Sequence, residues 1–219
     1  KKYLFKNTKY YMHFIYFYKR ILKLIKLKRI VVFCGSSLGF NPIYKEAAVE
    51  LGNYFTNNNI GLVYGGGKIG MMGAIADTIL AKNGEVIGVI PKLLEKEEVV
   101  HAGVEEMIVC KTMSERKVIM SKLIDGYITL PGGFGTLDEL FEALTLGQLH
   151  IEQKPVGLLN INGFFDATLL QLDKMVAEGF LKQTNRNMLL IGTSIDELMQ
   201  KMNNYKAPEI SHVINKVIR

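Results

Sequence analysis

A glycine-rich stretch followed by two acids lies near the middle of the chain: residues 130–140 read Leu-Pro-Gly-Gly-Phe-Gly-Thr-Leu-Asp-Glu-Leu. The residues before it (126–130) predict a buried strand, and the apolar spacing after Leu140 predicts an amphipathic helix. Glycines at such a junction let the backbone approach a ligand closely. The free N–H groups and dipole of the helix start favour an anion such as phosphate. The residues expected to bind phosphate are Gly132, Gly133, Gly135 and Thr136.

Two carboxylates, Asp138 and Glu139, stand at the mouth of this predicted anion site. A phosphate cradle beside an acid suggests chemistry on a phosphorylated sugar, because carboxylates stabilise the positive charge that develops during glycoside cleavage. The spacing Thr136-x-x-Glu139 is also that of a capping box, with Thr136 as the N-cap. On the residues alone, capping is at least as well supported as catalysis. Glu142, one turn further on, suits a surface role as well as a site role.

A pair of cations, Arg116 and Lys117, follows Thr112 and Glu115, which themselves have the spacing of a capping box. Cations near a helix start oppose its dipole. The pair is therefore either solvated or held there by an anion, and arginine is suited to bidentate contact with phosphate or carboxylate. The residues alone do not separate these two interpretations.

Two further glycine loops follow predicted strands: Gly35-Ser36 after residues 29–34, and residues 65–70 (Gly-Gly-Gly-Lys-Ile-Gly) after residues 61–64. The second loop formally matches a dinucleotide fingerprint, but it follows the second strand, and Pro91 replaces the acid expected at the end of the next strand. It lacks the Lys-Ser/Thr of a phosphate-binding P-loop. The loop is either a tight turn or part of a nucleotide-pocket wall, to which we assign Gly35, Ser36, Gly66 and Gly67.

Strands and helices are predicted to alternate along the chain, which is typical of a parallel sheet covered on both faces. The expected strands are 29–34, 61–64, 86–90, 107–110, 126–130, 155–159 and 188–191. The expected helices are 42–57 (capped by Asn41), 71–82, 112–124, one after Leu140, 164–178 and 195–202, with an irregular charged loop at 92–104. In such sheets ligands bind beyond the carboxyl ends of the strands, near the point where strand order reverses.

The charge of the chain is unevenly distributed. The net charge is +6, yet residues 1–30 hold ten of the 27 basic residues and no acid, so that the remainder holds 17 basic and 21 acidic residues. This predicts no nucleic-acid-binding face on the body. Residues 1–28 form a basic, aromatic N-terminal extension whose apolar run is too short to span a bilayer. It could dock on the body or a second subunit, be an upstream stretch with little function, or attach to a membrane surface. Residues 206–219 form a tail.

No cofactor is expected. His101 and His150 are isolated, favour surface or loop positions, and belong to no cluster with metal-ligand spacing. Lys68 and Lys117 lack the context of a Schiff-base lysine, and the Ser36-Ser37 pair lacks the partners of an acyl-transfer triad. The two cysteines, Cys34 and Cys110, are predicted as small core residues rather than a bridge, which favours a reducing, cytoplasmic location.

Residues 131–139 resemble the PGGxGTxxE motif of the Lonely Guy (LOG) family of nucleotide phosphoribohydrolases, and the resemblance extends from about residue 29 to about 199. Residues 113–117 resemble the family's Met-His-Glu-Arg-Lys segment, with Ser114 in place of histidine. The resemblance implies catalytic roles for Glu139 and Arg116. It implies hydrolysis of the N-glycosidic bond of cytokinin riboside monophosphates or AMP to free base and ribose 5-phosphate. It also implies a homodimer or larger assembly.

We therefore expect one Rossmann-like, doubly wound α/β domain over residues 29–205, with a mainly parallel sheet of about seven strands. Its catalytic residues would be Glu139 and Arg116, with Lys117 joining the glycines in substrate binding. Glutamine at position 139 could still cap but carries no charge, so loss of turnover in that variant would separate catalysis from capping. The competing functions are a non-catalytic nucleotide-binding sensor of the same fold and, less well supported, an NAD-dependent oxidoreductase.

Overall fold

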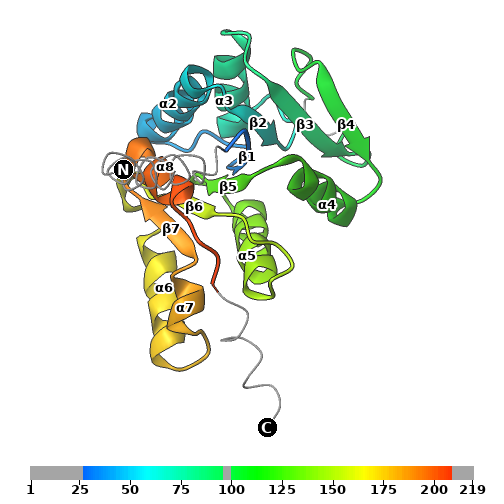
Figure 1. Ribbon diagram of the computed structural model, residues 1–219. Helices are drawn as coiled ribbons and strands as arrows, with labels where there is room; N and C mark the ends of the chain where they lie inside the picture. The colour runs from blue at the N-terminus through cyan, green and yellow to red at the C-terminus, as the bar shows by residue number, and fades with distance from the viewer. Residues whose placement is uncertain (1–26, 96–99, 209–219) are drawn as a thin grey trace, which may run out of the picture.

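The computed structural model describes residues 27–95 and 100–208, so the predictions for residues 1–26, for 96–99 of the charged loop and for 209–219 lie outside the described residues. The described strands form one seven-stranded sheet in the order β4-β3-β2-β1-β5-β6-β7, and every neighbouring pair is parallel (Figure 1). The strands are β1 (Arg29–Phe33), β2 (Gly61–Tyr64), β3 (Val86–Pro91), β4 (Glu106–Cys110), β5 (Gly126–Thr129), β6 (Val156–Leu159) and β7 (Leu189–Gly192).

The central strands are buried on both faces, as their continuous apolar runs predict. β1 pairs with β2 on one side and with β5 on the other. The chain moves outward from β1 to β4, crosses the sheet, and moves outward again from β5 to β7. The reversal of strand order therefore lies between β1 and β5, where ligands bind in open α/β sheets.

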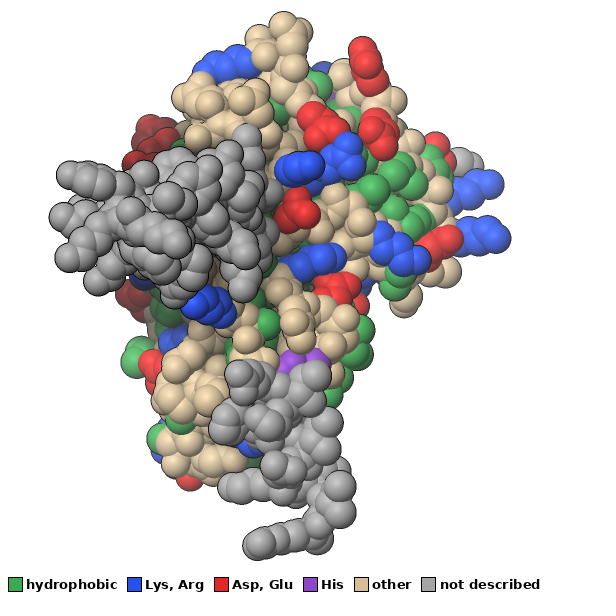
Figure 2. Space-filling model, in the orientation of Figure 1, with side chains coloured by type: hydrophobic (Ala, Val, Ile, Leu, Met, Phe, Trp, Pro, Cys, Tyr) green, Lys and Arg blue, Asp and Glu red, His purple; other side chains and the backbone are tan. Residues whose placement is uncertain are grey.

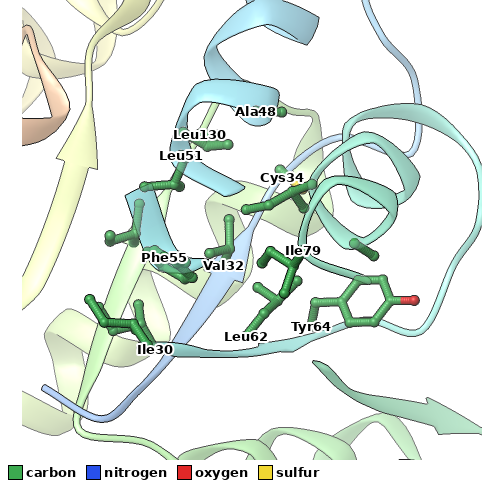
Figure 3. Close-up of a cluster of buried hydrophobic side chains, with 14 of the residues drawn as sticks. Ile30, Val32, Cys34, Ala48, Leu51, Phe55, Leu62, Tyr64, Ile79 and Leu130 are labelled. Atoms are coloured by element: carbon green, nitrogen blue, oxygen red, sulfur yellow. The ribbon is translucent and has the colours of Figure 1, made fainter. Parts of the chain in front are cut away.

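Helices cover both faces of the sheet, as predicted. They are α2 (Pro42–Asn58), α3 (Gly70–Leu80), α4 (Met113–Leu123), α5 (Phe134–Gln148), α6 (Asp166–Ala177), α7 (Gln183–Arg186) and α8 (Ile195–Asn203), with a 3-10 turn η1 (Ile161–Gly163) before α6. Apolar residues of α2, α3 and α8 form one core with one face of the strands, and those of α4, α5 and α6 form a second core on the other face. Figure 3 shows the first core, in which Phe55 and Leu51 of α2 lie over Ile30 and Val32 of β1.

Most element boundaries lie within two residues of the predictions, and the Asn41 cap is confirmed, since its Oδ1 accepts from the N–H of Ile43. Three details were wrong or missed. α5 begins at Phe134, three residues before the start that Thr136 as the N-cap would give. β3 extends one residue further than predicted and ends at Pro91, which is paired with Cys110. The short helix α7 was not predicted. Among the described residues, no helix combines the length and apolar character needed to cross a membrane.

Candidate active site

Three loops meet at the carboxyl edge of the sheet, beside the reversal point. The N–H of Gly35 after β1 donates to the carbonyl of Pro131 after β5 over 3.0 Å, and the carbonyl of Gly35 accepts from the N–H of Met71, at the start of α3, over 3.1 Å. The loop after β2 packs equally closely, since a Cβ on Gly70 (φ +67°) would come within 2.5 Å of the Ser37 nitrogen. The predicted meeting of the loops after β1, β2 and β5 is therefore confirmed.

The start of α5 carries no side-chain cap. Gly133 is the N-cap residue, and Thr136 lies inside the first turn with its hydroxyl against Gly132. The predicted capping box was therefore wrong, because the helix begins too early for Thr136 to be its N-cap, and Glu139 lies in its second turn. A Cβ on Gly133 or Gly135 would meet no atom within 4 Å. The backbone is therefore uncrowded on the Cβ side of these two glycines, and no side chain caps the helix start, which leaves its first N–H groups without a side-chain acceptor, as an anion site requires.

Glu139 is a nearly buried carboxylate one turn beyond this helix start, with 12% of its side chain exposed. Burial raises its pKa to about 7; the charges of Arg116 and Lys117 act in the opposite direction, while those of Asp138 and Glu142 add to the rise. The group therefore titrates near neutral pH. A carboxyl in that range can stabilise a cation when ionised and take up a proton at little cost.

Arg116 projects from the first turn of α4 toward this carboxylate and is only 10% exposed, so it is not a solvated cation. Its Nε donates to the carbonyl of Val89 in β3 over 3.0 Å, and its Nη1 lies 3.8 Å from Glu139 Oε1. Its guanidinium covers Gly65, where an added Cβ would overlap Nη2 and lie 3.5 Å from Cζ. Glycine at position 65 is thus what makes room for the arginine.

Lys117, which the sequence suggested as a substrate ligand, lies between two acids of α5. Its Nζ is 2.7 Å from Asp138 Oδ2 and also contacts Glu142 Oε2, and 19% of its side chain is exposed. Burial lowers the pKa of Lys117, but its hydrogen bonds to Asp138 and Glu142 outweigh burial and the net pKa is raised. Glu142, for which surface and site roles were both open, is thus bonded to a cation beside Glu139.

The capping pattern at the start of α4 is present, with one change. The N–H of Glu115 donates to Thr112 Oγ1, and the Glu115 carboxylate accepts from the N–H of Lys111 rather than from that of the N-cap. The cap fixes the first turn of α4, which carries Arg116 and Lys117.

A small cavity of about 20 Å³ lies between α4 and α5 on one face of the sheet. Glu139, Lys117 and Glu142 line one part of it, and apolar or aromatic groups line most of the rest: Phe33, Met120, Tyr127, Ala143 and Leu146, with Ser121. The hydroxyls of Tyr127 and Ser121 both donate to Glu152, which sets the polar end of this wall. The sequence did not reveal this cavity, because it depends on how the consecutive elements α4, β5 and α5 pack around β1, which lies much earlier in the chain.

His101 lies in a loop, which was one of the two positions predicted for it. Its side chain is buried, however, and not on the surface. Its Nδ1 accepts from the N–H of Gly103, and its Nε2 lies 2.9 Å from Asp77 Oδ1. Its backbone N–H donates to the carbonyl of Gly66. Gly66 and Gly67 are buried beneath this segment, whereas Ser36 is exposed at the sheet edge.

Within residues 27–95 and 100–208, no group of three or more His, Cys, Asp or Glu side chains is arranged to bind a metal ion. Cys34 and Cys110 are both free and buried. Burial, together with the nearby Glu139 charge, raises the pKa of the Cys34 thiol far above its usual range, so this thiol stays protonated and unreactive. On the face seen in Figure 2, acidic and basic side chains are interspersed and form no single basic patch.

The glycines of the α5 loop give a matched stability test. A Cβ at Gly132 would overlap the Thr136 hydroxyl and lie 2.8 Å from the Gly35 nitrogen. We expect Gly132→Ala to lower the free energy of unfolding by about 1–3 kcal/mol, as overpacking does. Gly135→Ala meets no atom and should be neutral or stabilising by up to about 1 kcal/mol, because alanine favours the helix. Denaturant unfolding of both variants measures the difference; equal losses would contradict the loop geometry.

Comparison with known proteins gives a consistent assignment. The family model described as "Possible lysine decarboxylase" matches residues 72–202. The cytokinin riboside 5'-monophosphate phosphoribohydrolase LOG1 of Arabidopsis thaliana is 47% identical over 180 residues, which cover 82% of this chain and 84% of that protein. The probable phosphoribohydrolase LOGL1 of rice (Oryza sativa subsp. japonica) is 45% identical over 177 residues, covering 81% of this chain and 79% of that protein.

Solved structures share the fold at lower identity. The molybdenum cofactor binding protein of Rippkaea orientalis superposes with a TM-score of 0.60 at 23% identity, covering 79% of this chain and 94% of that chain. The molybdenum cofactor carrier protein of Chlamydomonas reinhardtii gives 0.58 at 18%, covering 78% and 93%. These matches establish the Rossmann-type fold. Taken with the sequence matches over most of the chain, they show that this protein belongs to the LOG family.

Proposed function

We propose that the protein hydrolyses the N-glycosidic bond of nucleoside 5′-monophosphates, releasing the free base and ribose 5-phosphate. The C1′–N bond breaks, a water oxygen bonds to C1′, and one proton of that water ends on the base. The observation that carries the proposal is a nearly buried carboxylate, that of Glu139 beside Arg116, one turn from a helix start that has no side-chain cap. The name borne by relatives at 47% and 45% identity supports the same reaction.

The proposed binding mode follows from the direction of α5. The 5′-phosphate lies at the Gly132–Thr136 turn, where the helix dipole and free N–H groups favour an anion. The ribose then extends toward Glu139, whose ionised carboxylate stabilises positive charge at C1′ and accepts a proton from the attacking water. Arg116 holds that carboxylate in place from the α4 side.

The base lies toward the cavity between α4 and α5 in this proposal. The rings of Phe33 and Tyr127, with centroids 5.8 Å apart, and the side chains of Met120 and Leu146 give this side of the site a mainly apolar wall, which an uncharged planar group can face. The family names favour adenine carrying a cytokinin side chain, with AMP as the alternative.

The catalytic unit comprises residues 29–205 in this proposal and functions as a homodimer or larger assembly in the cytoplasm. Three exposed, large apolar side chains of α4 and α5 support the assembly: Val118, Phe134 and Phe141 are 52%, 95% and 37% exposed. Two free buried cysteines fit a reducing compartment.

A product assay tests the proposal. The protein should release free base from isopentenyladenosine monophosphate or from AMP, and the corresponding nucleosides should react at least about 100-fold more slowly in kcat/KM, because the charge-assisted hydrogen bonds to phosphate are lost. Equal rates with and without the phosphate would show that the turn at the start of α5 does not bind the phosphate. Nucleotide binding with no base released would leave a sensor as the function, and NAD binding would favour the oxidoreductase.

A further inference from the structure

Five charged side chains meet where α4 packs beside α5, and the cations of α4 face the acids of α5. Arg116 and Lys117 come from α4, and Asp138, Glu139 and Glu142 from α5. Asp138 and Glu142 are four residues apart and lie on one side of the helix. Lys117 contacts both of them, while Arg116 lies beside Glu139.

Without Lys117 this arrangement would be unfavourable for an ionised Glu139. Three carboxylates would face a single cation, and two of the carboxylates lie within one turn of Glu139. Like charges at this distance disfavour ionisation of a neighbouring carboxyl, and opposite charges favour it. Two other titratable groups lie on this side of the site: Cys34, which directly follows β1 and is buried and protonated, and Tyr127, which lines the same cavity and whose hydroxyl pKa is raised by burial.

We propose that Lys117 is a positioning residue: its ammonium group gathers the carboxylates of Asp138 and Glu142, ties α4 to α5, and so keeps Glu139 ionised and directed at the sugar. This role rests on the proposed function, since it matters only if Glu139 acts as a carboxylate. In this role Lys117 supports the Glu139 carboxylate and does not bind the substrate phosphate. Two observations support that choice: Lys117 already satisfies two acids, and only 19% of its side chain is exposed.

Variants that remove one charge test this role, because each is expected to move the midpoint of the pH profile in a defined direction. The acid limb of kcat/KM against pH should have its midpoint near 7 in the unaltered protein. Lys117→Met should move the midpoint up by about 1 pH unit, which is about a tenfold loss at pH 6, whereas Lys117→Arg should leave it in place. Glu142→Gln should move the midpoint in the opposite direction, and the double variant Lys117→Met/Glu142→Gln should return toward the original value. Lys122→Met, an exposed lysine in the last turn of α4, is the matched control and should shift nothing.

A ligand-free measurement separates this proposal from the proposed function. The difference in unfolding free energy between the protein and its Glu139→Gln variant, followed from pH 4.5 to 9, reports the ionisation of Glu139 without any substrate. Its midpoint should rise in the Lys117→Met background. A shift there in a protein that releases no base would uphold the Lys117 role and overturn the enzymatic one. An unshifted midpoint in Lys117→Met, or a raised KM for the nucleotide with no shift, would overturn the Lys117 role and make the lysine a substrate ligand.

Discussion

Glu139→Gln is expected to lower kcat by on the order of 10³-fold with little change in nucleotide binding, which is the loss usual when one preorganised electrostatic group is removed. Glutamine keeps the size and hydrogen-bonding capacity of the side chain but cannot stabilise a cation at C1′. Because the proposed binding mode places the 5′-phosphate on backbone N–H groups one turn away, KM for the nucleotide should move less than about threefold. Single-turnover rates and equilibrium binding of the product base and ribose 5-phosphate separate the two effects.

The same variant should be more stable than the unaltered protein above neutral pH. The folded pKa of Glu139 is raised from 4.5 to about 7 by burial, so the folded state favours the protonated carboxyl. Stability is therefore undiminished below pH 4.5, where both states are protonated, and falls as the pH rises through the folded value. The full shift corresponds to about 3 kcal/mol. Glu139→Gln escapes that loss, so its advantage should be about 2–3 kcal/mol at pH 8 and vanish near pH 4.5.

The control for this measurement is Glu46→Gln, an exposed acid of α2, which should change neither activity nor unfolding by more than about 0.5 kcal/mol. Normal turnover in Glu139→Gln would leave this residue a structural carboxylate. A stability gain that does not depend on pH would show that burial of the charge is not the cause.

The start of α5 illustrates what local sequence could and could not specify. The pattern Thr136-x-x-Glu139 predicted a cap, yet the helix begins at Phe134. Gly132 packs against Thr136 and against Gly35 of another loop, so the turn is set by contacts between segments about 100 residues apart. The buried strands were predicted within a residue or two because runs such as Ile30 to Phe33 have one stable environment, a sheet covered on both faces.

The candidate site, too, was predictable from the sequence only in part. Alternation of strands and helices was enough to predict that the loops after β1, β2 and β5 share one edge, and hence which glycines meet. The partners of the charged residues were not predictable. Arg116 is held by the carbonyl of Val89, 27 residues earlier, and Lys117 by acids 21 and 25 residues later. These contacts depend on how α4 packs on β3 and beside α5, and no spacing along the chain encodes them.

Arg116→Met should cost both activity and stability, and by a different route from Glu139→Gln. The methionine keeps part of the apolar stem but leaves the Val89 carbonyl without its donor, which costs about 1–3 kcal/mol for a buried group. It also removes the cation nearest to Glu139, so the carboxyl becomes harder to ionise. We expect kcat/KM to fall by about 100-fold at pH 7 and to recover partly toward pH 9, as the pH profile and thermal unfolding should show.

Gly65 gives an independent way to displace the same guanidinium. A Cβ at Gly65 would overlap Arg116 Nη2 and lie 3.0 Å from Met72 Sδ. Gly65→Ala should therefore push the arginine from its place without removing its charge, and reproduce part of the loss. In the Arg116→Met background the overlap with Nη2 is gone, so the same alanine should cost clearly less, and the two variants should be non-additive in both kcat/KM and unfolding free energy. Additive effects would mean that the alanine acts through the glycine loop itself, and that Arg116 needs no glycine beneath it to reach Glu139.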